Sequence, residues 1–181
     1  MISMMNQGRD DFLYLETDDF QAVKLPYGEK QQFFMYVWLP KQKIEDLVDQ
    51  LTSENWQEWQ GGFAPKKGTL WLPKFKLEYK QELKEVLTDL GMGLAFSDQA
   101  DFSGMTDEVE LMISQVLHKT FIEVNEEGTE AAAATSVGMA MTSFGGDEKS
   151  FNMEVNRPFL VMIVDVGSGE MVFTGWVKNP K

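Results

Sequence analysis

The chain has 181 residues, 43% of them hydrophobic and 12% aromatic, which suits one domain with a sizeable core and excludes a disordered composition. Its formal net charge is −13, from 29 acidic and 16 basic residues, and such an acidic surface disfavours nucleic acid as a partner because it repels phosphates. There is no cysteine and one histidine, His118, so disulfides and thiol nucleophiles are excluded and few options remain for a triad or a zinc site.

No apolar run approaches the roughly 20 residues of a membrane span, and the first residues lack the basic-then-apolar order of a signal peptide. We therefore expect no membrane partner, no metal and no cofactor. The composition points away from an enzyme and towards a binding or structural role.

The first third of the chain predicts two strands and two helices. Residues 12–15 and 33–38 are expected to be strands, separated by a turn at Pro26-Tyr27-Gly28. The second run is apolar on both faces and ends at Pro40, which predicts burial on both sides. Residues 44–51 have apolar side chains at helical spacing, and a short helix over residues 55–59 is expected to end at Gly61-Gly62.

The middle of the chain alternates strand and helix patterns. Residues 70–79 predict a strand with one solvent-exposed face, and residues 83–90 predict a helix that stops at Gly91. Residues 100–106 are typical of a turn region. Residues 111–125 favour one long strand, with a helix over 109–119 as the alternative.

The end of the chain predicts a β-hairpin. Residues 159–166 and 171–177 are continuous apolar runs joined by Gly167-Ser168-Gly169. Continuous apolar runs are typical of strands covered on both faces, so both strands are expected to be central.

Residues 128–146 differ in composition from everything around them. They contain four consecutive alanines followed by small residues, and they lie between two β-forming regions. By composition alone this segment would be a surface helix or a flexible linker.

Several motifs together change that interpretation. The run from His118 to Thr135, HKTFIEVNEEGTEAAAAT, resembles the strand and hinge of a serpin, a suicide-type serine protease inhibitor. Residues 156–160, NRPFL, and 173–180, FTGWVKNP, resemble the serpin C-terminal signature, and residues 72–75, 87–92 and 96–104 match family segments in the family's order. The resemblance covers residues 3–180. It implies an α+β fold of mainly antiparallel β-sheets with a few helices, in which residues 1–181 form a partial serpin domain with an exposed reactive loop at about 128–150.

The resemblance also implies a mechanism. A protease attacks the reactive loop and forms an acyl-enzyme, after which the cut loop enters the main sheet as an added strand and deforms the protease before water can hydrolyse the ester. Rapid entry needs small side chains at the hinge, with a pivot glycine of unrestricted φ. With a period of two, Thr129 shares a face with Ala131 and Ala133 while Glu130 points to the other. The inhibitory pattern is met by Glu126, Glu127, Gly128, Thr129, Glu130, Ala131, Ala132, Ala133 and Ala134.

Counting as in inhibitory serpins places the residue before the scissile bond fourteen after Gly128, at Thr142, followed by Ser143, with Met141 and Ser143 as alternatives. Residues 131–147 contain no Lys or Arg. The expected partner is therefore a serine protease of the elastase, chymotrypsin or subtilisin type and not a trypsin-like one.

His118 is expected to be a histidine satisfied in a buried hydrogen-bond network. The resemblance gives it a gating role where the sheet parts, and no catalytic role.

Measured against the family, the chain corresponds to about the C-terminal half of the domain. The N-terminal half, with the strands between which the loop inserts, is an expected partner, and residues 111–125 would lack a neighbour on the insertion side. The alternative is a truncated or non-inhibitory product that is cleaved as a substrate or serves as a binding module. The family favours an extracellular location, and the absence of cysteine leaves a cytoplasmic one open.

Overall fold

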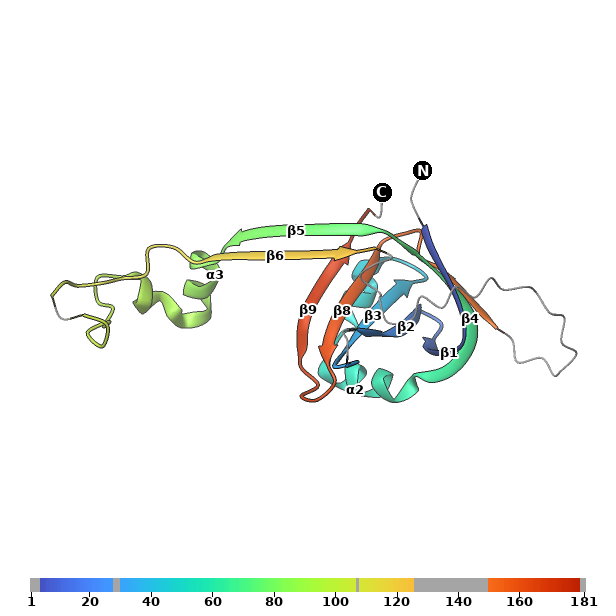
Figure 1. The fold of residues 1–181 in the computed structure, drawn as a ribbon. Helices are drawn as coiled ribbons and strands as arrows, with labels where there is room; N and C mark the ends of the chain where they lie inside the picture. Colours follow the sequence, from blue (N-terminus) through green and yellow to red (C-terminus); the bar gives the residue numbers. More distant parts are fainter. Residues whose placement is uncertain (1–3, 28–29, 107, 126–149, 180–181) are drawn as a thin grey trace, which may run out of the picture. The chain divides into compact units, whose positions relative to one another are not determined.

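The computed structural model describes residues 4–27, 30–106, 108–125 and 150–179. The chain divides into two compact units, which we call unit 1 (residues 1–75 and 123–181) and unit 2 (residues 76–122). Unit 1 is built on one large β-sheet, and unit 2 on a two-stranded ribbon followed by short helical turns (Figure 1).

The sheet of unit 1 has seven strands among the described residues. Their order is β7-β4-β1-β2-β3-β8-β9, and every neighbouring pair is antiparallel except β4 and β7. The strands are β1 (Met4–Glu16), β2 (Phe20–Tyr27), β3 (Phe33–Pro40), β4 (Ala64–Pro73), β7 (Phe151–Glu154), β8 (Phe159–Asp165) and β9 (Met171–Val177).

The strands predicted near the start are confirmed, but the turn at Pro26-Tyr27-Gly28 is wrong in part. Pro26 and Tyr27 continue β2 and pair with Phe34 and Phe33 of β3. Burial of Leu25 keeps the strand on the sheet at this point, and the fixed φ of proline suits an extended chain. β3 lies between β2 and β8 and is buried on both faces from Met35 onward, as predicted.

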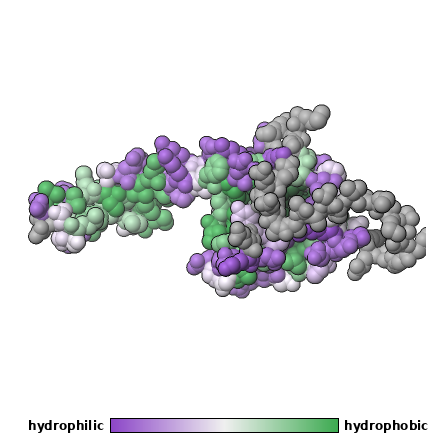
Figure 2. Space-filling view, in the orientation of Figure 1, coloured by the Kyte–Doolittle hydropathy of each residue, from purple (hydrophilic) through white to green (hydrophobic). Residues whose placement is uncertain are grey.

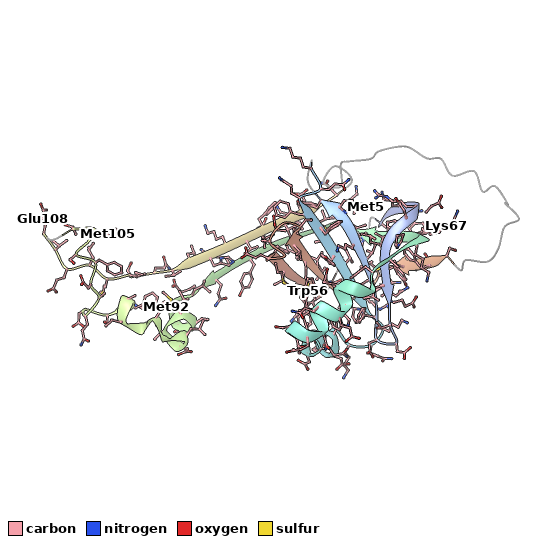
Figure 3. All side chains as sticks on the ribbon, turned by 90° about the horizontal axis from the view of Figure 1, so that it is seen from below. Met5, Trp56, Lys67, Met92, Met105 and Glu108 are labelled. Atoms are coloured by element: carbon pink, nitrogen blue, oxygen red, sulfur yellow. The ribbon has the colours of Figure 1, made fainter. Side chains whose placement is uncertain are left out.

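Two helices cover one face of the sheet. They are α1 (Ile44–Asp49) and α2 (Ser53–Gly62), and α1 buries Ile44 and Leu47. α2 starts earlier than predicted because Thr52 caps it: the Thr52 hydroxyl accepts a hydrogen bond from the backbone N–H of Asn55 at 3.2 Å. Figure 3 shows Trp56 on α2, and its ring lies 5.4 Å from that of Tyr36 and 6.1 Å from that of Trp38. The helices are thus held on the sheet mainly by aromatic packing.

The C-terminal hairpin is confirmed, although only one of its strands is central. β8 is buried from Phe159 to Val164. β9 is the edge of the described sheet, and Val172 is 56% exposed there. The continuous apolar run 171–177 predicted a central strand, but among the described residues β9 has only β8 as a neighbouring strand.

Unit 2 contains the ribbon of β5 (Phe75–Glu82) and β6 (Leu117–Val124), which run in opposite directions (Figure 1). The single strand predicted over residues 70–79 is wrong in extent, because the chain leaves the large sheet after Pro73 and resumes as β5. Helical turns follow, α3 (Lys84–Leu87) and the irregular segments Thr88–Met92 and Gly93–Phe96. Regular α-helix ends at Leu87, earlier than predicted, and Gly91 breaks the irregular turn that follows with a φ of 98°, where the sequence predicted a stop.

The long strand predicted over residues 111–125 begins only at Leu117, and the alternative helix does not form. Backbone N–H groups before Leu117 bond elsewhere in unit 2. Ile113 donates to the Ala95 carbonyl at 3.0 Å, and Val116 donates to a carboxylate oxygen of Glu82 at 3.1 Å. These bonds replace the ladder that a longer strand would need.

Candidate functional site

The candidate site is the segment between β6 and β7 together with the two strands that flank it. The hinge and reactive-bond predictions, Glu126 to Ala134 and Met141 to Ser143, lie outside the described residues. The structure describes the amino-terminal flank, β6 with His118, and the carboxyl-terminal flank, which begins at Phe151.

β6 ends at Val124 and leads directly to the predicted hinge. Among the described residues it belongs to a sheet of two strands, with β5 as its neighbour. Its second edge therefore carries no described strand. An unpaired edge presents a row of backbone donors and acceptors that a further strand can bond.

His118 lies on β6 and is exposed, so the predicted buried network is wrong. Its Nε2 atom is 2.8 Å from the Thr120 hydroxyl oxygen, two residues along the same face of the strand. A two-stranded ribbon cannot bury side chains at this position by itself. A gating role for His118 is therefore not visible in the described contacts.

The carboxyl-terminal flank is anchored by Phe151, the first residue of β7. β7 pairs in parallel with β4, with Phe151 opposite Gly68, and the Val155 N–H continues the contact by donating to the Trp71 carbonyl at 2.8 Å. The Phe151 ring stacks on Tyr14 with centroids 3.8 Å apart and planes at 10°, and it meets Phe12 edge-on at 5.5 Å.

A chain of hydrogen bonds surrounds the Tyr14 hydroxyl. It donates to Glu16 at 2.8 Å and accepts from the Gln21 amide at 2.8 Å, and that amide also donates to the Asn152 carbonyl at 3.2 Å. Glu16 in turn pairs with Lys41 at 2.9 Å. The hydrogen bond from Lys41 is the main cause that lowers the pKa of the Glu16 carboxyl, whereas burial raises the pKa of the Tyr14 hydroxyl.

The residues of the C-terminal signature lie on the same sheet. Arg157 donates from Nε to the Pro40 carbonyl at 2.8 Å, which ties the start of β8 to the end of β3. Phe159 is fully buried and meets Phe75 edge-on with centroids 5.4 Å apart. The signature residues therefore have a packing role in unit 1.

No metal-binding arrangement emerges from the described residues. They contain no group of three His, Asp or Glu side chains that could hold a metal ion. The helices of the described segments are too short and too polar to cross a membrane.

The sequence matches the family model described as Serpin (serine protease inhibitor) over residues 1–180. This chain belongs to the serpin family. An uncharacterized serpin-like protein of Thermococcus kodakarensis is 37% identical over 182 residues, which are 100% of this chain and 42% of that protein. Serpin-Z4 of Hordeum vulgare is 41% identical over 91% of this chain and 43% of its own, and Serpin B13 of Homo sapiens is 37% identical over 99% and 46%.

Solved serpin structures have the same fold. The thermophilic serpin tengpin in the native state matches with a TM-score of 0.75 and 34% identity, over 97% of this serpin and 46% of tengpin. Thyroxine-binding globulin in complex with thyroxine matches with a TM-score of 0.81 and 24% identity, over 99% and 47%, which shows the fold alone. The chain thus spans less than half the length of the serpins it matches, and its fold is that of a partial serpin.

The sequence interpretation missed the anchor of the carboxyl-terminal flank. Phe151, Met153 and Val155 are buried and alternate with exposed residues, which is the period of a strand. That alternation was readable from the sequence. The stacking partner Tyr14 could not be predicted in this way, because it lies 137 residues before Phe151 in the sequence.

Proposed function

We propose that this serpin inhibits serine proteases as a suicide substrate through insertion of its reactive loop. The observation that carries the proposal is the open edge of β6, which ends at Val124 and leads within two residues to the hinge at Glu126. The family description, serine protease inhibitor, supports the same activity.

The hinge chemistry supports rapid insertion. Gly128 provides a pivot, and Thr129 and the alanines 131–134 are small enough to enter between strands. In this proposal the exposed reactive loop spans residues 128–150 of a partial serpin domain. The protease is acylated by the residue before the scissile bond, Thr142, with Ser143 following it, and Met141 and Ser143 are the alternatives.

The composition of the loop supports a target class. Because residues 131–147 contain no Lys or Arg, a trypsin-like pocket would find no cationic side chain there. An elastase, chymotrypsin or subtilisin type of pocket accepts Met141 or Thr142.

Insertion also needs the strand on the far side of the opening, which we propose is supplied by the N-terminal half of a serpin domain. Unit 2 supports this requirement, because Figure 2 shows hydrophobic side chains gathered on its surface. Leu90, Leu94 and Met105 are 75%, 62% and 78% exposed, and Figure 3 shows Met105 among the turns of this unit. Exposed apolar area of this kind marks an interaction surface.

The second candidate function is that of a protease substrate or binding module without trapping activity. The same open edge favours it if no N-terminal half joins this chain.

One experiment separates the two candidate functions. The chain is incubated with elastase- and chymotrypsin-type proteases, alone and with an N-terminal serpin half, and complexes that survive SDS are quantified. We expect cleavage within residues 139–144 for the chain alone and a covalent complex when both halves are present.

A matched pair of variants tests the hinge itself. Thr129→Arg puts a charged side chain on the face that must be buried, so the complex should give way to cleavage. Glu130→Arg changes the neighbouring residue on the opposite face and should preserve trapping. Equal trapping by both variants would refute loop insertion as the mechanism.

A further inference from the structure

β7 is a short strand with little backbone support. It spans four residues, lies at the edge of the described sheet and pairs with β4 in parallel. Parallel pairing is slightly less stable per residue than antiparallel pairing. The strand follows the segment 126–149 along the chain, so any side-chain contact that adds to its backbone hydrogen bonds bears on how that segment ends.

The Phe151 side chain provides that support. It is 6% exposed, stacked on Tyr14 and packed edge-on against Phe12. Its ring also lies directly over Gly68, where an added Cβ atom would be 2.2 Å from Phe151 Cδ1. No other residue type at position 68 leaves room for the ring, because real Cβ contacts are not this close.

A polar contact holds the same strand from another direction. The Gln21 amide joins the Tyr14 hydroxyl to the Asn152 carbonyl of β7, through bonds of 2.8 Å and 3.2 Å. The aromatic contact and the amide contact therefore converge on adjacent residues of β7. We call Phe12, Tyr14, Gln21 and Gly68 together the Phe151 seat.

We propose that the Phe151 seat fixes the carboxyl end of the reactive segment and that Gly68 is a positioning residue for protease trapping. This inference rests on the proposed function. A protease must bind the segment in an extended form, and the entropy of ordering it is lower when its end is already held. Gly68 touches neither the protease nor the scissile bond and acts only through Phe151.

The test replaces Gly68 by alanine and follows cleavage by trypsin after Lys149, which lies two residues before Phe151. Trypsin needs several residues in extended form around the bond, so a seated Phe151 protects it. Full burial of a phenylalanine ring corresponds to a factor of roughly 10 to 100 in an equilibrium constant. Gly68→Ala should therefore speed the appearance of a peptide beginning at Ser150 by at least about tenfold, as measured by mass spectrometry.

The matched control is Gly8→Ala, on β1 beside β4. A Cβ atom at Gly8 meets only the Gly68 carbonyl oxygen, at 4.0 Å, so cleavage after Lys149 should stay at the wild-type rate. In the double variant with Gly68→Ala and Phe151→Leu, the smaller side chain relieves the clash and should recover part of the protection. Wild-type protection in Gly68→Ala, or no recovery in the double variant, would overturn the proposal.

Two further readouts keep the result interpretable. Tryptophan emission, to which all five tryptophans of unit 1 contribute, reports whether Gly68→Ala is folded. If it is not, Gln21→Leu decides, because loss of the amide contact alone should raise cleavage after Lys149, and an unchanged rate would overturn the proposal.

The proteolysis result does not depend on inhibition, so it separates this inference from the proposed function. If both halves trap a chymotrypsin-type protease, Gly68→Ala should also lower the second-order rate of complex formation several-fold. Faster cleavage with an unchanged trapping rate would show that the seat holds β7 without positioning the segment for the protease, which overturns the role assigned to Gly68.

Discussion

Replacing Phe159 by alanine should destabilise unit 1 strongly. Phe159 is fully buried at the start of β8 and packs edge-on against Phe75 at 5.4 Å. Truncation of a buried phenylalanine to alanine costs about 3–5 kcal/mol through lost transfer energy and the cavity left behind. About 0.5–1.5 kcal/mol of that loss belongs to the ring pair itself. Since native domains are stable by only about 5–15 kcal/mol, this loss is a large fraction of the total free energy of unfolding.

The assay is urea unfolding followed by tryptophan fluorescence. All five tryptophans, Trp38, Trp56, Trp59, Trp71 and Trp176, lie in unit 1, so the signal reports this unit. A double-mutant cycle with Phe75→Leu isolates the coupling of the two rings.

Val172→Ala is the control for the Phe159 variant. Val172 is 56% exposed on β9, so its truncation should change the free energy of unfolding by no more than about 0.5 kcal/mol. A loss below about 1 kcal/mol for Phe159→Ala, or a loss equal to that of the control, would refute the packing role of the signature residue.

Two other predictions concern pH and backbone conformation. Burial raises the pKa of Tyr36 to about 12, and its hydroxyl donates to Gln60 at 2.6 Å. The stability that Tyr36 contributes is therefore complete below pH of about 10, the unfolded pKa, and is lost as the pH rises through about 12. Tyr36→Phe should flatten the fall of the free energy of unfolding between these pH values, and an unchanged slope would contradict the assignment. Gly91→Ala forces a φ of 98° on an alanine at a cost of about 1–2 kcal/mol, without a steric clash. Hydrogen exchange in residues 84–96 should speed up about tenfold, while Gly104→Ala should leave it unchanged, and equal rates would contradict strain at Gly91.

Most of the elements of unit 1 could be predicted from local patterns. Residues 33–38 and 159–166 are continuous apolar runs, and both became strands buried on two faces, β3 and the core of β8. Residues 44–51 have helical spacing, and Ile44 and Leu47 of α1 are the residues that this spacing turns towards the sheet. These patterns work because burial of one face decides the local structure.

The errors arise where partners distant in sequence decide the outcome. β2 continues through Pro26 because β3 pairs with it, and β6 starts late because Glu82 and Ala95 bind the backbone of residues 113–116. His118 is exposed because its strand lies in a two-stranded ribbon. No local pattern contains this information, since the number of neighbouring strands is a property of the whole sheet.

The candidate site was predicted on one side and missed on the other. The motif from His118 to Thr135 pointed to β6 as the amino-terminal flank, and the hinge residues within it stay a prediction. The anchor of Phe151 on Tyr14 and Gly68 requires the register of β7, β4 and β1, which the sequence does not reveal.

The most direct test of the account is mass spectrometry of the product formed when a chymotrypsin-type protease meets this chain together with an N-terminal serpin half. The account predicts that a serine of the protease is esterified to the carboxyl group of Thr142, with the peptide from Ser143 onward released from that bond. The account would be contradicted if the protease is recovered free, the chain is cut into two peptides, and no ester is found at any residue from 141 to 143.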